Sequence, residues 1–276
     1  MTESASGNSG LFETATDPDA LERAAAAVTP TSVERADLAM VQTLDATLRE
    51  PMYALLTSLA DNKYVLGRRY AEWCTGAPML ESAVAAAAMA QDELGHARSF
   101  YPLLRGFSGG RDAPQMEEKG WQQRPTSAMR CLDARFGGWT DFVAVNLLID
   151  TALSTLLSAA VDALYEPLRQ RARKIQQEEA AHWVHATGWL RRIGSPASGA
   201  LAAVWDDAFT WFGQSDDPVL SPLSNAGILT ETPDALRKNL RARLEPVLDE
   251  AGLAEPLLGR PLPWSRWDPA ARRLVT

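Results

Sequence analysis

The sequence predicts an all-α protein built on a bundle of four long helices with flanking helices. Ala, Leu, Arg and Glu, which favour helices, are abundant, and runs of β-branched residues are scarce. Apolar residues recur at alternating steps of three and four over long segments, as on the buried face of a helix. Prolines and glycines stand where these segments are expected to begin and end. The 276 residues are enough to bury one large core.

The first helix is predicted over Ser32–Glu50, after a disordered tail at residues 1–30 that is rich in Ser, Thr, Ala and Asp. The bundle itself is expected within residues 31–213. Its four long helices are predicted near Pro51–Thr75, Pro78–Arg105, Trp139–Tyr165 and Pro167–Ile193. An amphipathic helix over residues 198–213 follows them. Residues 214–276 are Pro-rich and are predicted to form an irregular extension with a short helix near Asp234–Ala251.

The connection between the second and third long helices, residues 106–138, is too long for a tight turn. Such a length suits a crossover between two helical hairpins, as in ferritin-like bundles. The third helix, FVAVNLLIDTALSTLLSAAV, is long enough to cross a membrane, but Asn146 and Asp150 lie at its middle. A buried helix of the bundle explains this segment better, so no membrane span is expected.

The charge and cysteine content exclude several classes of protein. A net charge of −8 and a pI near 5.0 argue against binding to nucleic acid, which needs a basic surface. Cys74 and Cys131 are too few and too far apart for a disulfide framework or a Cys-x-x-Cys zinc site. The N-terminus lacks the pattern of a signal peptide. We therefore expect a cytoplasmic protein.

The apolar stripe of each long helix is interrupted near its middle by ionisable residues. In chain order, these residues are Lys63, Glu93 with His96, Asp150, and Glu179 with His182. Antiparallel packing of the helices would bring all of them to one level of the core. An unpaired charge in a bundle core costs several kcal/mol, so these groups are expected to pair or to bind metal.

Two of the interruptions share the pattern Gln-acid-Glu-x-x-His, as QDELGH and QEEAAH. Residues three apart lie on one face of a helix, so Glu93 with His96, and Glu179 with His182, can each bind one ion. Two such pairs and carboxylates from the other two helices form the dimetal site of ferritin-like proteins. The sequence therefore predicts a metal site, and a purely structural polar layer is the alternative.

Lys63 stands where such a bundle normally supplies a fourth carboxylate. Three carboxylates and one ammonium carry a net charge of minus two, which one divalent ion would neutralise. The lysine can also pair with the acids and exclude metal, or lose its proton. The stripe could instead be rotated so that Lys63 reaches solvent. Asp61 and Glu72 could compensate for it, but neither shares its position on the stripe.

Three further residues adjoin the motifs. His185 lies one turn after His182 and is predicted to be a core residue or a supporting neighbour rather than a ligand. Asp92 and Glu178 precede the two ligand glutamates and point off the stripe. They are expected to face solvent or form salt bridges, although hydrogen bonds to the histidines remain an alternative.

At these residues the chain resembles the ferritin-like subunits of bacterial phenylacetyl-CoA epoxidase, a multicomponent monooxygenase. The segment LADNKYVLGRRYAEWCTGAPMLE resembles the family's structural subunit, whereas QDELGHA, Asp150 and EEAAHW resemble its catalytic, diiron subunit. The resemblance implies that a ligand glutamate of the catalytic subunit is replaced by Lys63. It also implies that the other iron-ligand positions are kept, at Glu93, His96, Asp150, Glu179 and His182.

Two functions are compatible with this resemblance, of which we expect the first and keep the second as the alternative. The first is an oxygenase component that uses O2 to epoxidise an aromatic ring carried on coenzyme A. It would bind two irons, one or none, with Lys63 as an unusual catalytic neighbour of the metal, and it would need a reductase and a homologous ferritin-like subunit. The second is a non-catalytic structural partner in such an oligomeric enzyme, with a metal-free cluster of acids and lysine.

Overall fold

The computed structural model describes residues 39–107 and 126–275, and this part of the chain is mostly helical. The predicted tail at residues 1–30 lies outside the described residues. The elements, in chain order, are α3 (Ala46–Ala71), α4 (Leu80–Phe100), η1 (Tyr101–Gly106), η3 (Arg130–Leu132), α6 (Trp139–Val145), η4 (Asn146–Asp150), α7 (Thr151–Ser158), α8 (Glu166–Ile193), η5 (Ser195–Ala197), α9 (Ser198–Thr210), α10 (Leu220–Asn225), α11 (Pro233–Glu250), α12 (Ala254–Leu258), η6 (Trp264–Arg266), β1 (Trp267–Asp268) and β2 (Arg273–Leu274).

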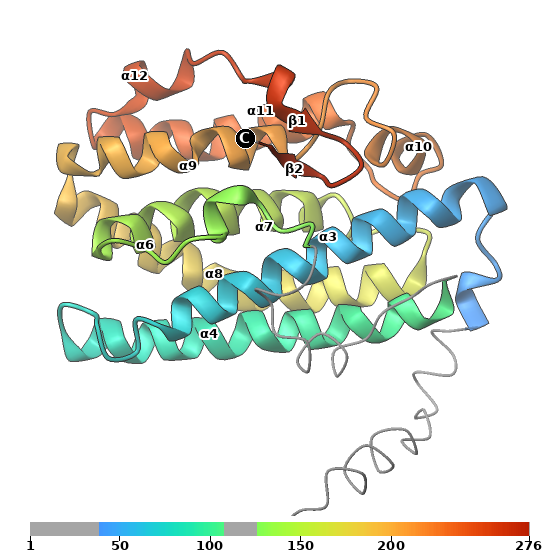
Figure 1. Cartoon of the computed structure of the whole chain (residues 1–276), viewed down its shortest axis with the longest axis horizontal. Coiled ribbons are helices and arrows are strands. Elements are labelled where there is room, and N and C mark those ends of the chain that lie inside the picture. The colour runs from blue at the N-terminus through green and yellow to red at the C-terminus, as the bar shows by residue number, and fades with distance from the viewer. Residues whose placement is uncertain (1–38, 108–125, 276) are drawn as a thin grey trace, which may run out of the picture.

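Four long helical segments lie alongside one another: α3, α4, the continuous segment α6–η4–α7, and α8 (Figure 1). α3 packs along α4, and α8 packs against both α4 and α6–η4–α7. α9 and α11 cover η4 and α7 on the far side from α4, and the short antiparallel pair β1–β2 contacts α9. The core therefore lies among the four long segments, where their apolar stripes meet.

α3 begins earlier than the sequence indicated. The prediction that a helix ends before Pro51 and another begins there is wrong, because α3 starts at Ala46 and passes through Pro51. The side chain of Asp45 caps it by accepting from the backbone N–H of Thr47 at 2.8 Å. An aspartate in this position satisfies an N–H group that would otherwise be unpaired, so it is a stronger start signal here than the proline.

The third long helix ends sooner than predicted, at Ser158 instead of Tyr165. Beyond it, the carbonyl oxygen of Ala159 accepts the backbone N–H of Thr230 at 2.9 Å. This bond joins the end of α7 to residues that follow α10. A tertiary contact thus takes the place of continued helix.

The C-terminal extension is more ordered than the predicted irregular segment with one short helix. Its described residues form α10, α11, α12 and the β1–β2 pair, and α11 corresponds to the helix predicted near Asp234–Ala251. A buried ion pair fastens its end, with Arg272 Nη1 lying 2.8 Å from Asp217 Oδ1. Another guanidinium nitrogen of Arg272 donates to the carbonyl oxygen of Trp211 at 2.7 Å. The extension also packs on the long helices, because α10 contacts α3 and α11 contacts α7 and α8.

The close approach of α3 to α4 depends on Gly67. A Cβ atom at this position would lie 2.9 Å from Leu94 Cγ and 3.0 Å from Glu93 Cβ. Both distances are shorter than a relaxed carbon–carbon contact of about 3.5 Å. Glycine at this point thus sets the distance between α3 and the helix that carries the first Glu-x-x-His motif.

We expect Gly67→Ala to lower the free energy of unfolding by about 1–3 kcal/mol, because the added methyl group forces the two helices apart. The matched control is Gly95→Ala on α4, where an added Cβ meets nothing within 4 Å. The control should be neutral or more stable by about 0.5–1 kcal/mol, since alanine favours a helix. Urea unfolding measures both values. Equal effects of the two substitutions would contradict the packing argument.

Candidate functional site

The structure brings the predicted ionisable residues of the four long segments together in the core. α3 supplies Lys63, α4 supplies Glu93 and His96, η4 supplies Asp150, and α8 supplies Glu179 and His182. All six side chains are buried, and Lys63 and Glu93 are 0% exposed. These groups lie at one level of the core because each stands near the middle of its helix, as the apolar stripes predicted. We refer to these six residues as the central cluster.

The ammonium group of Lys63 lies among the three carboxylates. Its Nζ is 2.9 Å from Glu93 Oε1 and 3.0 Å from Asp150 Oδ1, and it also donates to Glu179 Oε1. An ammonium group has three N–H donors, so all three are used. The alternative in which Lys63 reaches solvent is therefore wrong.

The charges of Lys63 and its partners depend on one another. Burial by itself lowers the pKa of Lys63, but the carboxylates of Asp150, Glu179 and Glu93 raise it by more, to well above its ordinary value. Lys63 is thus a permanent cation. Burial raises the pKa of Glu179 to about 7, helped by the nearby charge of Asp150. Burial by itself raises the pKa of Asp150, but the charge of Lys63 opposes this effect and the pKa lies well below its usual range.

The two histidines face the cluster in the same way. His182 Nδ1 lies 2.8 Å from Asp150 Oδ2, and 3.5 Å from both Glu93 Oε1 and Glu179 Oε2. His96 Nδ1 is 3.6 Å from Glu179 Oε1 and 3.8 Å from Glu93 Oε2. In each ring Nδ1 therefore points inward and Nε2 points away from the cluster.

Asp92 and Glu178 bind the outward nitrogens across the helix pair. Glu178 Oε2 on α8 lies 2.8 Å from His96 Nε2 on α4, and Asp92 Oδ2 on α4 lies 3.3 Å from His182 Nε2 on α8. Both alternatives for these acids hold: they bond to histidine and stay 36% and 40% exposed, and Glu178 also pairs with Lys174 at 3.8 Å. Each acid holds the ring of the opposite motif in place.

The nearby acids also favour the charged form of both histidines. Burial lowers the pKa of both rings, but the surrounding acids together raise it by more, chiefly Asp150 for His182 and Glu93 for His96. The pKa of each ring thus lies above its ordinary value. With both imidazoles protonated, Lys63, His96 and His182 balance the three central carboxylates.

Several residues around the cluster were not identified as functional from the sequence. Ser154 Oγ donates to Glu179 Oε2 at 3.1 Å, and Asn146 Nδ2 donates to Asp150 Oδ2 at 3.4 Å. Both lie one turn from Asp150, so polar residues at that spacing in an apolar helix were the available signal. His185 is a supporting neighbour and not a member of the cluster, with Nδ1 lying 3.0 Å from Asn146 Oδ1.

Asp150 is positioned by an irregularity in its helix. Asn146–Asp150 form a π-helical turn, η4, between α6 and α7. The wider turn changes the angle at which later side chains leave the helix, and such turns are frequent at functional sites. It places Asp150 toward Lys63 and Ser154 toward Glu179. A heptad count alone does not reveal this turn.

The fit of these residues to a dimetal centre depends on Lys63. Four ligand atoms of Glu93, Asp150, Glu179 and His182 lie within 4.8 Å of one another, a spacing that could hold a metal ion. However, the Lys63 ammonium contacts each of the three carboxylates and supplies the positive charge that a metal would bring. With Lys63 in this position, the residues do not fit two metal ions.

Neither acid near Lys63 in sequence supplies the missing ligand. Asp61 accepts from Tyr101 Oη at 3.0 Å and from the backbone N–H of Ser127 at 2.9 Å. Glu72 pairs with Arg69 at 2.7 Å. Asp61 therefore anchors the residues before η3, and Glu72 holds an arginine at the end of α3.

The recess nearest the cluster, between Asp150, Glu179 and Arg243, is too small to admit a water molecule. The helical segment Trp139–Ser158 passes a length and hydropathy test for a membrane span, but 89% of its most apolar window is buried inside the protein. It is thus a core helix, as predicted. On the side of the recess, α7, α8 and α11 seal the cluster.

Sequence comparison relates this chain to known proteins. Residues 36–268 match the family described as phenylacetic acid catabolic protein. The chain is also similar to one of the subunits of the 1,2-phenylacetyl-CoA epoxidase of Escherichia coli (strain K12). The two are 29% identical over 205 residues, which cover 72% of this chain and 81% of that protein.

Proposed function

Because this chain belongs to the phenylacetic acid catabolic protein family, we propose that it is a non-catalytic subunit of a phenylacetyl-CoA epoxidase-type monooxygenase. In this role it supports a homologous catalytic subunit. The family resemblance read from the motifs is confirmed by the match. The proposal further takes the helices to be a ferritin-like bundle spanning residues 31–213, in a cytoplasmic oligomer.

The position of Lys63 carries this proposal. An ammonium group with three buried carboxylate partners supplies positive charge to the core without metal. Glu93 Oε2 and His96 Nδ1 are left without a hydrogen-bond partner among the described residues. The protonated histidines complete the charge balance, and Asp92 and Glu178 hold them from outside. A cluster whose three carboxylates already contact a buried cation gains little from metal. Similarity to a protein that is named as one subunit of an epoxidase also supports a role inside a larger enzyme.

A second candidate is the oxygenase component with an atypical metal site. The observation that favours it is the close set of ligand atoms from Glu93, Asp150, Glu179 and His182. If the ammonium of Lys63 moved aside, these residues and His96 could hold one iron. When bound, iron would supply the O2 chemistry, with a reductase as electron donor and an aromatic acyl-CoA as substrate. Lys63 would then be a catalytic neighbour of the metal.

Metal analysis separates the two candidates. We expect the full-length protein, purified without chelator and supplied with Fe(II) under nitrogen, to contain far less than one iron per chain. Its thermal midpoint should not change when Fe(II) or Mn(II) is added, because a ligand stabilises a fold only if the folded state binds it. One iron per chain, or a rise of several degrees on adding metal, would overturn the non-catalytic role in favour of the oxygenase.

A further inference from the structure

Exposed large hydrophobic side chains gather on one side of the molecule. Among the described residues six such side chains are exposed, and four of them lie on α8 or at the start of α4. They are Met79, Leu80, Val84 and Val184, of which the last three are 62–76% exposed. α4 and α8 are neighbours in the fold (Figure 1). A gathering of this kind marks a surface that another molecule covers.

Over part of their length, the outer sides of these two helices also carry little charge, namely Glu81 and the side chains of Asp92 and Glu178, which are 40% and 36% exposed. From Leu80 to Gly95, the exposed residues of α4 include a single charged side chain, Glu81. From Gln177 to Gly188, those of α8 are Gln177, Ala180, Ala181, Val184 and Gly188, with no charge at all. By contrast, the exposed residues of α11 include Asp234, Lys238, Glu245, Asp249 and Glu250. A helix that faces water normally resembles α11. We refer to the weakly charged side of α4, from Leu80 to Gly95, and of α8, from Gln177 to Gly188, as the α4–α8 face.

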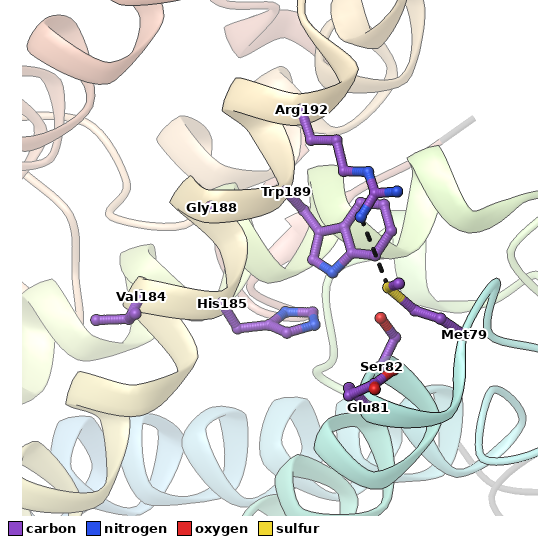
Figure 2. A pocket seen from close by; sticks show the side chains of 8 residues that line it. All are labelled: Met79, Glu81, Ser82, Val184, His185, Gly188, Trp189 and Arg192. Carbon is purple, nitrogen blue, oxygen red and sulfur yellow. Dashed lines mark hydrogen bonds between the residues drawn. The ribbon is translucent and has the colours of Figure 1, made fainter.

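A pocket of about 310 Å³ opens at one end of the α4–α8 face. It is lined by Met79, Glu81, Ser82, Val184, His185, Gly188, Trp189 and Arg192 (Figure 2). The absence of a side chain at Gly188 leaves the space over His185 open. A volume of this size accepts one bulky apolar side chain, the kind of anchor that dominates protein interfaces.

His185 presents an unused acceptor in the pocket. Asn146 Nδ2 faces Asp150, so Asn146 Oδ1 must accept the Nδ1–H of His185. Burial, aided by the charge of His182, lowers the pKa of His185 to about 4, so the ring is neutral. Its Nε2 is therefore an acceptor, and this buried atom has no hydrogen-bond partner among the described residues. A buried acceptor left without a partner costs about 1–3 kcal/mol.

Arg192 supplies an unused positive charge at the rim. Its guanidinium group stacks over Trp189, 5.0 Å from the ring centroid, and its Nη1 contacts the sulfur of Met79 at 3.6 Å. Within the part of the chain that the structure describes, it forms no ion pair. An occupant that complements this pocket therefore has an apolar side chain, a hydrogen-bond donor for His185 and a carboxylate for Arg192.

We propose that the α4–α8 face binds the homologous catalytic subunit, which inserts a bulky apolar side chain into the pocket. This inference rests on the proposed function, because a non-catalytic subunit must hold its partner by some surface. The partner is a helical chain that meets the exposed apolar residues of this face with apolar and small side chains. It places a donor at His185 Nε2 and an acidic group at Arg192.

The first test places charges on the face. The variant Val84→Glu/Val184→Glu should weaken binding to the co-expressed, purified catalytic subunit at least about 100-fold, since each glutamate would be buried without a partner. The matched control is Leu164→Glu/Val275→Glu, which adds the same charges at exposed apolar sites elsewhere, 71% and 42% exposed. The control should bind within about threefold of the unaltered protein. Biolayer interferometry measures the affinities, and circular dichroism checks the fold.

The second test fills the pocket without harming the fold. In Gly188→Leu the new Cβ meets nothing within 4 Å. Leucine also favours a helix over glycine, so the thermal midpoint should rise by about 2 °C. Binding of the catalytic subunit should nevertheless fall at least about 30-fold. Gly199→Leu, at an equally open position on α9, is the control and should leave binding unchanged.

The outcomes distinguish this inference from the proposed function. If the unaltered chain binds the catalytic subunit and both face variants bind equally well, the α4–α8 face is wrong while the proposed function stands. If the unaltered chain does not bind that subunit, both are wrong. If sedimentation shows that the chain alone forms a dimer that the face variants dissociate, the occupant is a second copy and the proposed partner is overturned.

Discussion

Replacing Lys63 with glutamate is expected to create a site that binds two divalent metal ions per chain. The substitution removes the ammonium that contacts Glu93, Asp150 and Glu179, and it adds a fourth carboxylate at the same level. Four carboxylates balance the charge of two divalent ions, and the inward Nδ1 atoms of both histidines complete the donor set. The repulsion that would otherwise destabilise the variant becomes the driving force for metal binding.

Co(II) is a suitable probe, because it does not oxidise readily and absorbs visible light when bound. Metal content should rise to about two per chain in Lys63→Glu and stay near zero in the unaltered protein. The thermal midpoint of the variant should be low without metal and rise by several degrees on adding Co(II). The control is Lys238→Glu, which makes the same charge change at an exposed site on α11. A variant that folds but binds no metal would contradict the role assigned to Lys63.

Replacing Lys63 with methionine should cost about 3–5 kcal/mol of stability, because it leaves three buried carboxylates without their central cation. Methionine has a similar length and no charge, so packing changes little. The loss measures how strongly the ammonium holds the cluster, independently of any metal. Lys238→Met on the surface should change the free energy of unfolding by less than about 0.5 kcal/mol.

The loss in Lys63→Met should depend on pH in a defined direction. Burial already raises the pKa of Glu179 to about 7, and Lys63 lowers it. Without Lys63, the pKa of Glu179 in the folded protein rises further above its value in the unfolded chain. The contribution of Glu179 to stability is then fully present below the unfolded pKa and is lost as the pH rises through the folded pKa. Urea unfolding should therefore find a larger deficit near pH 8 than near pH 5. A deficit that grows toward low pH would refute this assignment of charge.

Much of the central cluster could be predicted because helical periodicity is local. The spacing of Glu93 and His96, and of Glu179 and His182, defines one face of each helix whatever surrounds it. The apolar residues on the same faces then indicate that these groups are buried. The same reasoning identified Asp150 and the unusual position of Lys63, and the structure has both in contact.

Other features depend on how the helices meet. Asp92 and Glu178 each bind a histidine on the other helix, which depends on the relative height of α4 and α8. The π-helical turn at Asn146–Asp150 shifts the side chains after it, and no local pattern predicted it. The start of α3 at Ala46 depends on the capping bond of Asp45, which the prediction of a helix boundary at Pro51 did not include.

The sequence by itself thus determined the helical class, the two Glu-x-x-His motifs and the presence of a lysine among buried acids, since each follows from the order of residues along one helix. Only the tertiary structure decided that the Lys63 ammonium contacts all three carboxylates, and that Leu80, Val84 and Val184 remain uncovered. The physical reason is the same in both cases. Periodicity defines the faces of a helix, whereas the packing of helices decides which faces meet, at what height, and which are left for a partner.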